Sequence, residues 1–396
     1  MHRNFRVLVL SVSAGAGHVR AAQALCAQAQ LSHPQLQLTH LDVMEVVPAT
    51  FRKLYSESYI KLVAKAPALW AYLYQRTDRR TGSSHADRLR RGIERLNTRQ
   101  LQQEIDQLAP HAIICTHFLP AELLSRRIRK RRTCPPVWVQ VTDFDVHGLW
   151  LQEHMHGYFV ASEEVAARLI DKGISAQRTV VSGIPIMPAF ASAPDRSTAA
   201  VELDLDPSIS TVLMMSGGAG VGDLAALTAR LLHAIADLQV IALAGRNQEL
   251  LAQLAALAKH FPTRLRPMGF TTTVERAMAA ADLAVTKPGG LTSSECLAMN
   301  LPMIVIAPIP GQEERNADFL LESGAALKAV DAAALEFKVR RLLQHPAMLD
   351  GMRERMRSAA RPQAARTVLD GIQQQLTAAS ECGPRASEAQ RTGQSR

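Results

Sequence analysis

Short apolar runs alternate with longer stretches of helical periodicity along most of the chain. Apolar runs of this length are typical of buried parallel strands, and the stretches between them predict crossover helices. The predicted strands form two series, at 5–12, 35–43, 112–117, 137–144 and 157–162, then at 211–217, 238–245, 265–270, 283–289 and 302–308. The pattern therefore predicts an α/β protein in which two parallel sheets are each covered by helices on both faces.

The first strand of each series runs into a glycine-rich turn that opens a helix. SAGAGH occupies 13–18 and SGGAGVG occupies 216–222. Such turns are typical of the start of a doubly wound sheet, so each series predicts its own domain. We place an N-terminal domain at 1–192, a polar linker at 193–208, a second domain at 209–345, helices that pack back on the first domain at 346–375, and a disordered tail at 376–396.

Composition limits the partners without choosing one. The formal net charge is +9, which favours an anionic partner such as a nucleotide, a nucleic acid or an anionic bilayer. The five cysteines are scattered and never form a CxxC pair, which argues against a zinc ribbon or disulfide framework and is typical of a reducing cytosol. No window of about 18 apolar residues exists and a strand-like run begins at Phe5, so neither a transmembrane helix nor a signal peptide is predicted.

The segment from about 50 to 100 interrupts the α/β rhythm with aromatic residues followed by arginines. Rings at headgroup level and cations facing lipid phosphates are typical of an interfacial element. The residues predicted to meet the membrane are Tyr55, Tyr59, Trp70, Arg79, Arg80, Arg90 and Arg91. A helical insertion that packs its aromatics on the domain is the alternative, and both interpretations can hold.

The stretch 286–324 carries the most specific chemistry in the second half. A predicted strand ends at Lys287, a Pro-Gly-Gly turn follows, and a helix is predicted to start near Thr292 with Glu295 in its first turn. A helix N-terminus binds anions, and Gly289 and Gly290 would let a nucleotide diphosphate approach the backbone closely. Glu295 could accept hydrogen bonds from ribose hydroxyls. Alternatively, Thr292-x-x-Glu295 is a capping box that serves the helix alone.

In the first half, Gly15, Gly17 and His18 lie at a predicted strand-to-helix turn. A histidine suits general-base chemistry at neutral pH, and a helix N-terminus would favour its neutral form. Asp143 and His147 are rivals for that role, since TDFDVH also pairs a carboxylate with an imidazole. A dinucleotide site that uses Asp42 is a weaker alternative, because the third glycine of that fingerprint is missing.

KPGGLTSSE with PIPGQEERNAD, and the turn that ends in Gly-His before paired alanines, resemble glycosyltransferase family 28. Within it the chain is most similar to the monogalactosyldiacylglycerol synthases and processive diacylglycerol glucosyltransferases. The resemblance implies a GT-B fold of two facing Rossmann-like domains with a cleft between them. The first domain would bind the acceptor and the second the UDP-sugar.

The resemblance also implies roles for individual residues. Glu295 would hold the ribose, Gln312 and Glu313 would meet the sugar hydroxyls, and His18 would be the base. The predicted donor site comprises Gly217, Gly218 and Gly220 near the diphosphate, Met268, Gly269 and Phe270 beside the uracil, and Lys287, Gly289, Gly290, Thr292, Glu295, Gln312 and Glu313. Gly15 and Gly17 would form an acceptor or phosphate loop. We expect neither metal nor cofactor, because helix dipoles can stabilise leaving UDP and Asp143-Phe144-Asp145 is only formally a DxD motif.

The implied activity is inverting transfer of galactose or glucose from a UDP-hexose to 1,2-diacylglycerol. The enzyme would be cytoplasmic, lie peripherally on the anionic inner face of the plasma membrane and bind no nucleic acid. A peptidoglycan lipid I N-acetylglucosaminyltransferase, a UDP-sugar epimerase and a non-catalytic nucleotide-sugar-binding protein are alternatives. The last is disfavoured by the intact His18. The sequence leaves the hexose, the number of sugars added and the oligomeric state open.

Overall fold

The computed structural model describes residues 4–13, 15–47, 99–130, 134–215 and 223–381. The segment 48–98 with its predicted membrane residues, and the turn with Gly217, Gly218 and Gly220, lie outside the described residues. Residues 382–396 also lie outside them.

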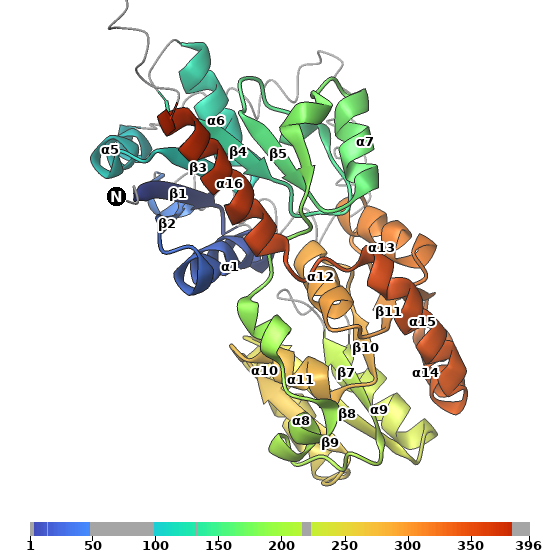
Figure 1. Cartoon of the computed structure of the whole chain (residues 1–396). Helices are drawn as coiled ribbons and strands as arrows, with labels where there is room; N and C mark the ends of the chain where they lie inside the picture. Colours follow the sequence, from blue (N-terminus) through green and yellow to red (C-terminus); the bar gives the residue numbers. More distant parts are fainter. Residues whose placement is uncertain (1–3, 14, 48–98, 131–133, 216–222, 382–396) are drawn as a thin grey trace, which may run out of the picture.

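Two six-stranded parallel sheets form the framework (Figure 1). The first has the order β2-β1-β3-β4-β5-β6 and the second the order β12-β11-β10-β7-β8-β9. The strands of the first sheet are β1 (Phe5–Ser11), β2 (Leu36–Asp42), β3 (Ala112–Cys115), β4 (Val137–Gln140), β5 (Gly157–Val160) and β6 (Thr179–Val181). Those of the second are β7 (Ser210–Met215), β8 (Leu238–Gly245), β9 (Leu265–Gly269), β10 (Leu283–Thr286), β11 (Met303–Ile306) and β12 (Ala326–Ala329). The predicted α/β class with two parallel sheets is confirmed.

Helices cover both faces of each sheet. Those of the first half are α1 (Ala16–Ser32), α5 (Arg99–Leu108), α6 (Phe118–Arg129) and α7 (Glu163–Asp171). Those of the second half are α8 (Arg196–Glu202), α9 (Leu224–Ala234), α10 (Gln248–Ala258), α11 (Val274–Ala280), α12 (Gly290–Ala298), α13 (Gln312–Glu322), α14 (Ala332–Gln344), α15 (Pro346–Ala359) and α16 (Ala364–Glu381). Short 3-10 helices lie at Val43–Glu45, Gly148–Trp150, Ala176–Arg178 and Pro188–Ser192.

Strand β1 shows why its sequence is almost wholly apolar. Val7 and Val9 belong to the cluster formed with α1 and α16, whereas Leu8 and Leu10 belong to the cluster formed with α5 and α6. Successive side chains of a strand point to opposite faces, so a strand covered on both sides needs apolar residues at every position.

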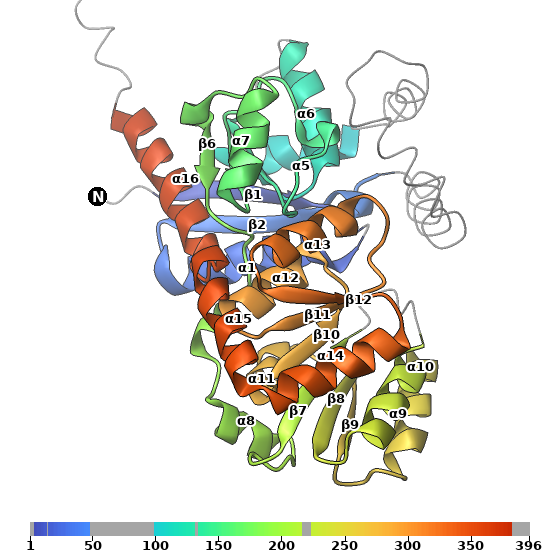
Figure 2. The ribbon, with the colours of Figure 1, turned by 90° about the vertical axis from the view of Figure 1, so that its right-hand side faces the viewer.

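The last helix returns to the first domain. α16 packs on α1 and buries Val368, Leu369 and Ile372 against the first sheet (Figure 2). It continues to Glu381 with Leu376 buried, so the boundary predicted for a disordered tail at 376 was wrong. The apolar face of α16 packs on α1, and this packing stabilises the helix beyond residue 376.

Residues 193–208 are not a free linker. They contain α8, whose Ala199 and Ala200 are buried and pack with α11 on the second domain. The chain crosses between the domains near Gly183 and again near Arg361. Gly183 has φ +86°, and a Cβ there would lie 2.4 Å from Cβ of Arg361, so the two crossings lie side by side. Only glycine fits that backbone and that contact.

Candidate functional site

His18 lies in the first turn of α1, where the structure fixes its tautomer. The preceding N-cap, Gly15, has φ 143° and offers no side-chain cap. The imidazole Nδ1 lies 3.0 Å from the backbone oxygen of Thr116, and 2.8 Å from the hydroxyl of Thr142. A carbonyl oxygen only accepts, so Nδ1 carries the proton and donates it. Nε2 is therefore left with the lone pair that a general base needs.

The surroundings also keep His18 neutral. Burial lowers the pKa of His18 to about 4, despite the opposing hydrogen bond to the Thr116 carbonyl. Burial, rather than the helix N-terminus that the sequence suggested, is the main cause. The ring of His117 meets that of His18 edge-on, with 4.5 Å between the ring centroids, and the centroid of the Trp150 ring lies 6.3 Å from that of His18. The imidazole is therefore neutral at physiological pH, with Nε2 unprotonated.

Asp143, one of the rivals for the role of base, joins the two domains. Its Oδ1 accepts hydrogen bonds from the side-chain amides of Gln312, at 2.5 Å, and Asn316, at 3.5 Å. Asn316 in turn accepts from the backbone N–H of Phe144 at 2.8 Å. Burial raises the pKa of Asp143 to about 6. In this structure the Asp143 carboxylate is therefore hydrogen-bonded to side chains of the second domain.

His147, the other rival, accepts a hydrogen bond at Nδ1 from the backbone N–H of Leu149 and so caps a 3-10 helix. Asp145, the second acid of the formal DxD motif, pairs with Arg168 at 2.8 Å. Asp42, considered for a dinucleotide site, accepts from the backbone N–H of Met44. All three side chains have local structural tasks, which leaves His18 as the candidate base in the cleft.

The donor side is built around the start of α12. The helix begins at Gly290 with Gly289 as its N-cap and no side-chain cap, so Thr292 lies inside the first turn. The predicted start near Thr292 was wrong, and with it the capping-box interpretation of Glu295, which lies in the second turn. The first N–H groups of α12 have no intrahelical acceptor and are available to an anion.

Glu295 is buried, with only 6% of the residue exposed. Among the described residues, no hydrogen bond to its carboxyl is found. Burial raises the pKa of Glu295 to about 8, with Arg20 opposing and Glu275 reinforcing the rise. A buried carboxyl with no hydrogen bond to the described part of the chain is a candidate to bind a ligand.

The loop before α13 holds two further predicted donor residues. Glu313 accepts a hydrogen bond from the backbone N–H of Ile309 at 2.7 Å. Lys287 is buried, which lowers its pKa, and the charge of Glu313 opposes that shift. Gln312 is engaged by Asp143. Lys287 and Glu313 thus interact behind the turn, and Gln312 would have to release Asp143 to meet a sugar.

The predicted uracil border lies at the end of β9. Met268 and Gly269 close that strand and are half-buried, whereas Phe270 is 60% exposed. The guanidinium of Arg246 lies over the Phe270 ring at 4.6 Å. The structure thus brings Gln312 into contact with the first domain, places His18 beside Thr142 at the domain contact, and leaves Phe270 exposed just beyond the end of β9.

The two domains touch where α12 begins. A Cβ at Gly290 would lie 2.2 Å from the backbone oxygen of Thr142, and one at Gly17 would lie 3.8 Å from Cβ of Leu291. Thr142 therefore contacts His18 through its hydroxyl and lies against the start of α12 through its carbonyl.

We expect Gly290→Ala to push the domains apart, because a backbone carbonyl cannot yield to a new Cβ as a flexible side chain can. Small-angle X-ray scattering should show a larger radius of gyration, with the melting temperature of each domain core little changed. Gly289→Ala is the matched control, since a Cβ there meets nothing within 4 Å. An unchanged radius for Gly290→Ala would show that this contact does not limit closure.

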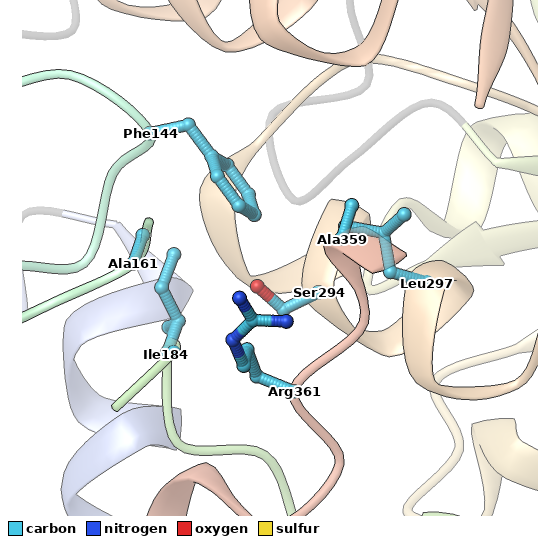
Figure 3. Close-up of a pocket in the computed structure, with 8 residues that line it drawn as sticks. Phe144, Ala161, Ile184, Ser294, Leu297, Ala359 and Arg361 are labelled. Carbon is cyan, nitrogen blue, oxygen red and sulfur yellow. The ribbon is translucent and has the colours of Figure 1, made fainter. Parts of the chain in front are cut away.

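A small pocket lies behind α12, beside the chain crossings (Figure 3). It is lined by Phe144, Ala161, Gly183, Ile184, Ser294, Leu297, Ala359 and Arg361. The Arg361 guanidinium is held by Glu163 at 2.6 Å, and Ser294 donates to the backbone oxygen of Gly290. The pocket therefore belongs to the joint between the domains.

Comparison with known proteins agrees with this geometry. The family model of monogalactosyldiacylglycerol (MGDG) synthase matches residues 18–186, and that of the glycosyltransferase family 28 C-terminal domain matches residues 211–374. The two matches together span most of the chain, which is therefore similar to glycosyltransferase family 28. The two models divide close to the division between the sheets, and the chain is a glycosyltransferase.

Curated relatives cover almost the whole chain. The processive diacylglycerol beta-glucosyltransferase of Bacillus pumilus (strain SAFR-032) is 26% identical over 378 residues, which span 95% of this chain and 96% of that protein. The protein of the same name from Bacillus cereus (strain AH187) is 28% identical over 380 residues, 94% of each.

Solved structures show the fold. MurG of Acinetobacter baumannii has a TM-score of 0.60 at 19% identity and covers 93% of this chain and 99% of its own. MnaA of S. aureus with UDP has a TM-score of 0.61 at 14% identity and covers 94% and 97%. The predicted GT-B fold, with two facing Rossmann-like domains, is confirmed.

Sequence reasoning missed several residues of this interface. Thr116 and Thr142 contact His18, and Asn316 contacts Asp143. The charge of Arg20 opposes the rise in the pKa of Glu295. None carries a motif of its own. Thr142 lies in TDFDVH (142–147) and Asn316 in the stretch 286–324, both discussed above, so their position beside candidate residues was the available signal.

Proposed function

We propose that this protein is an inverting glycosyltransferase that transfers a hexose from a UDP-sugar to 1,2-diacylglycerol. The observation that carries the proposal is the buried Glu295 carboxyl on α12, which has no hydrogen bond to the described residues and lies on a helix that packs against the one holding His18. Glu295 is suited to the two ribose hydroxyls, and the N-terminus of α12 to the diphosphate. The relatives named as diacylglycerol beta-glucosyltransferases support the acceptor and favour glucose.

The proposed chemistry is a single displacement. The acceptor hydroxyl oxygen attacks the anomeric carbon from the face opposite UDP, a new C–O bond forms, and the bond to the phosphate oxygen breaks with its electron pair. His18 Nε2 takes the hydroxyl proton. The N–H groups of α12 and the ammonium of Lys287 would stabilise the leaving UDP, so we propose no metal ion, and activity in excess chelator checks this.

Product analysis tests the function directly. The protein is incubated with vesicles that contain 1,2-diacylglycerol and with UDP-glucose or UDP-galactose in parallel, and lipids are separated by thin-layer chromatography. We expect a glycosyldiacylglycerol whose anomeric configuration, measured by NMR, is β. UDP release without glycolipid, or transfer only to lipid I with UDP-N-acetylglucosamine, would contradict the proposal.

Access to a lipid acceptor requires a membrane surface. Among the described residues, no helix is long and apolar enough to span a bilayer. We propose peripheral association with the cytoplasmic, anionic face of the plasma membrane through the aromatic and basic segment between 50 and 100. Arginines near an anionic surface contribute about 1 kcal/mol each, and salt screens them.

Replacing Arg79, Arg80, Arg90 and Arg91 by Gln is therefore expected to weaken binding to anionic vesicles and to lower turnover on vesicles more than turnover on detergent-dispersed acceptor. Wild-type binding should rise with anionic lipid and fall with salt. Sedimentation with vesicles of graded phosphatidylglycerol content measures it.

A control variant removes the same charge from the second domain. It replaces Arg230, Arg276, Arg341 and Arg357 by Gln. These arginines are on the domain proposed to bind the donor, and exposed ion pairs there contribute little to stability. Equal loss of vesicle binding in both variants would mean that net charge, and not this segment, attracts the membrane.

A further inference from the structure

Thr142 lies where the first domain meets the second, two residues after β4. It is buried, and its hydroxyl oxygen lies 2.8 Å from Nδ1 of His18. Thr116, directly after β3, binds the same nitrogen through its backbone oxygen at 3.0 Å, and its own hydroxyl donates to the backbone oxygen of His18 at 2.9 Å. Because the carbonyl can only accept, Nδ1 carries the proton and the Thr142 hydroxyl is a second acceptor for it.

Two acceptors restrict the imidazole more than one does. A ring held by a single hydrogen bond can still rock about that bond, whereas oxygens from two neighbouring strands limit this motion. The Thr116 carbonyl therefore decides which nitrogen of His18 is protonated, and the Thr142 hydroxyl helps to decide how the ring is oriented. The orientation of the ring in turn sets the direction of the lone pair on Nε2.

The second domain fixes the backbone that carries the Thr142 hydroxyl. A Cβ at Gly290 would lie 2.2 Å from the backbone oxygen of Thr142, so α12 lies directly against it. Two residues further on, the backbone N–H of Phe144 donates to the side chain of Asn316 at 2.8 Å. The Phe144 ring also stacks on that of Phe319, with 4.3 Å between the centroids. The hydroxyl that meets His18 therefore lies on a segment that both domains hold in place.

Resting on the proposed function, in which His18 Nε2 takes the acceptor proton, we propose that Thr142 is a positioning residue: its hydroxyl orients the imidazole towards the acceptor hydroxyl. Thr142 acts through the ring and not by binding a substrate. A base that is slightly displaced from the attacking oxygen transfers the proton less well. Loss of the hydroxyl should therefore lower kcat and leave the affinity for UDP unchanged.

Thr142→Val tests the proposal, because valine has nearly the shape of threonine but lacks the hydroxyl. We expect kcat on mixed micelles of diacylglycerol to fall about tenfold, which is the effect of losing one hydrogen bond in the reacting complex. The KM for UDP-hexose and the dissociation constant of UDP, measured by calorimetry, should not change. Thr142→Ser keeps the hydroxyl and should restore most of the turnover.

Thr228→Val is the matched control. Thr228 is buried in α9, and its hydroxyl has no hydrogen-bond partner in the part of the chain that the structure describes. The same chemical change there should leave kcat unaltered. Circular dichroism checks that the Thr142 variants are folded, and Thr142→Ala repeats the comparison with Thr142→Ser if valine disturbs the packing.

The background of His18→Ala separates positioning from a structural role. If Thr142 acts through the imidazole, Thr142→Val has no further effect on the residual turnover of His18→Ala. Wild-type kcat in folded Thr142→Val, an equal loss in Thr142→Ser, or the same fold-loss without His18 would overturn the inference. Failure of the wild type to form glycosyldiacylglycerol would instead overturn the proposed function.

Discussion

His18→Ala is expected to lower kcat at least about a hundredfold while UDP binding survives, because positioned general bases contribute about 10²–10⁴ in rate. The imidazole has its Nδ1 proton committed to the Thr116 carbonyl, so Nε2 is the only nitrogen that can take a proton. Steady-state kinetics on mixed micelles measures kcat, and calorimetry with UDP measures binding. His345→Ala, an exposed histidine of the second domain, is the matched control.

The pH profile gives a second reading of the same prediction. Since the pKa of His18 is lowered to about 4, the base is ready above that pH and lost below it. The acid limb due to His18 should therefore lie well below 6. A limb near 6 that disappears in Asp143→Asn would assign it to Asp143, whose pKa is raised to about 6. Near-normal turnover in folded His18→Ala would contradict the role of His18 as base.

Most strands of the two sheets could be predicted from the sequence, because a strand that is buried on both faces is apolar at every position. The two strands that the pattern missed are β6 and β12, each at an edge of its sheet. β6 is three residues long and nowhere fully buried, and β12 contains Lys328. An edge strand exposes part of its surface, so its sequence lacks the continuous apolar run of an inner strand.

The candidate site residues could be predicted from the sequence only where they form a recognisable motif. Gly-His at the first turn and Pro-Gly-Gly before α12 mark backbone that must lie close to a ligand. The bond between Gln312 and Asp143 joins residues 169 positions apart. No periodicity predicts it, since it depends on how the domains meet. The start of α12 was misplaced for the same reason: the local Thr292-x-x-Glu295 pattern is a good cap, but the turn before Gly290 decides where the helix begins.

Above pH 8, where the Glu295 carboxyl is ionised, Glu295→Gln is expected to weaken UDP binding about ten- to a hundredfold. A hydrogen bond to a charged acceptor contributes about 1.5–3 kcal/mol, and Gln keeps the size of the side chain but not its charge. The variant should not lose stability, because no hydrogen bond to Glu295 is found among the described residues. Calorimetry with UDP and thermal melts measure the two quantities separately.

The difference in stability between wild type and Glu295→Gln should also change with pH in one direction. The carboxyl has a pKa of about 8 in the folded protein, raised from about 4.3 in an unfolded chain. A carboxyl whose pKa is raised in the folded protein stabilises the fold while it is protonated. This contribution is lost as pH rises towards and through 8. Wild type should therefore lose melting temperature from pH 6 to 9 relative to Glu295→Gln, which cannot ionise.

Glu275→Gln is the control with the opposite expected sign. It removes a buried negative charge that opposes ionisation of Glu295, so UDP should bind as well as, or more tightly than, in wild type near pH 7. Weaker binding in Glu275→Gln as large as that in Glu295→Gln would mean that both act by disturbing the packing of α11 and α12. Unchanged UDP affinity in Glu295→Gln would leave the buried carboxyl without a ligand and remove the main support for the nucleotide site.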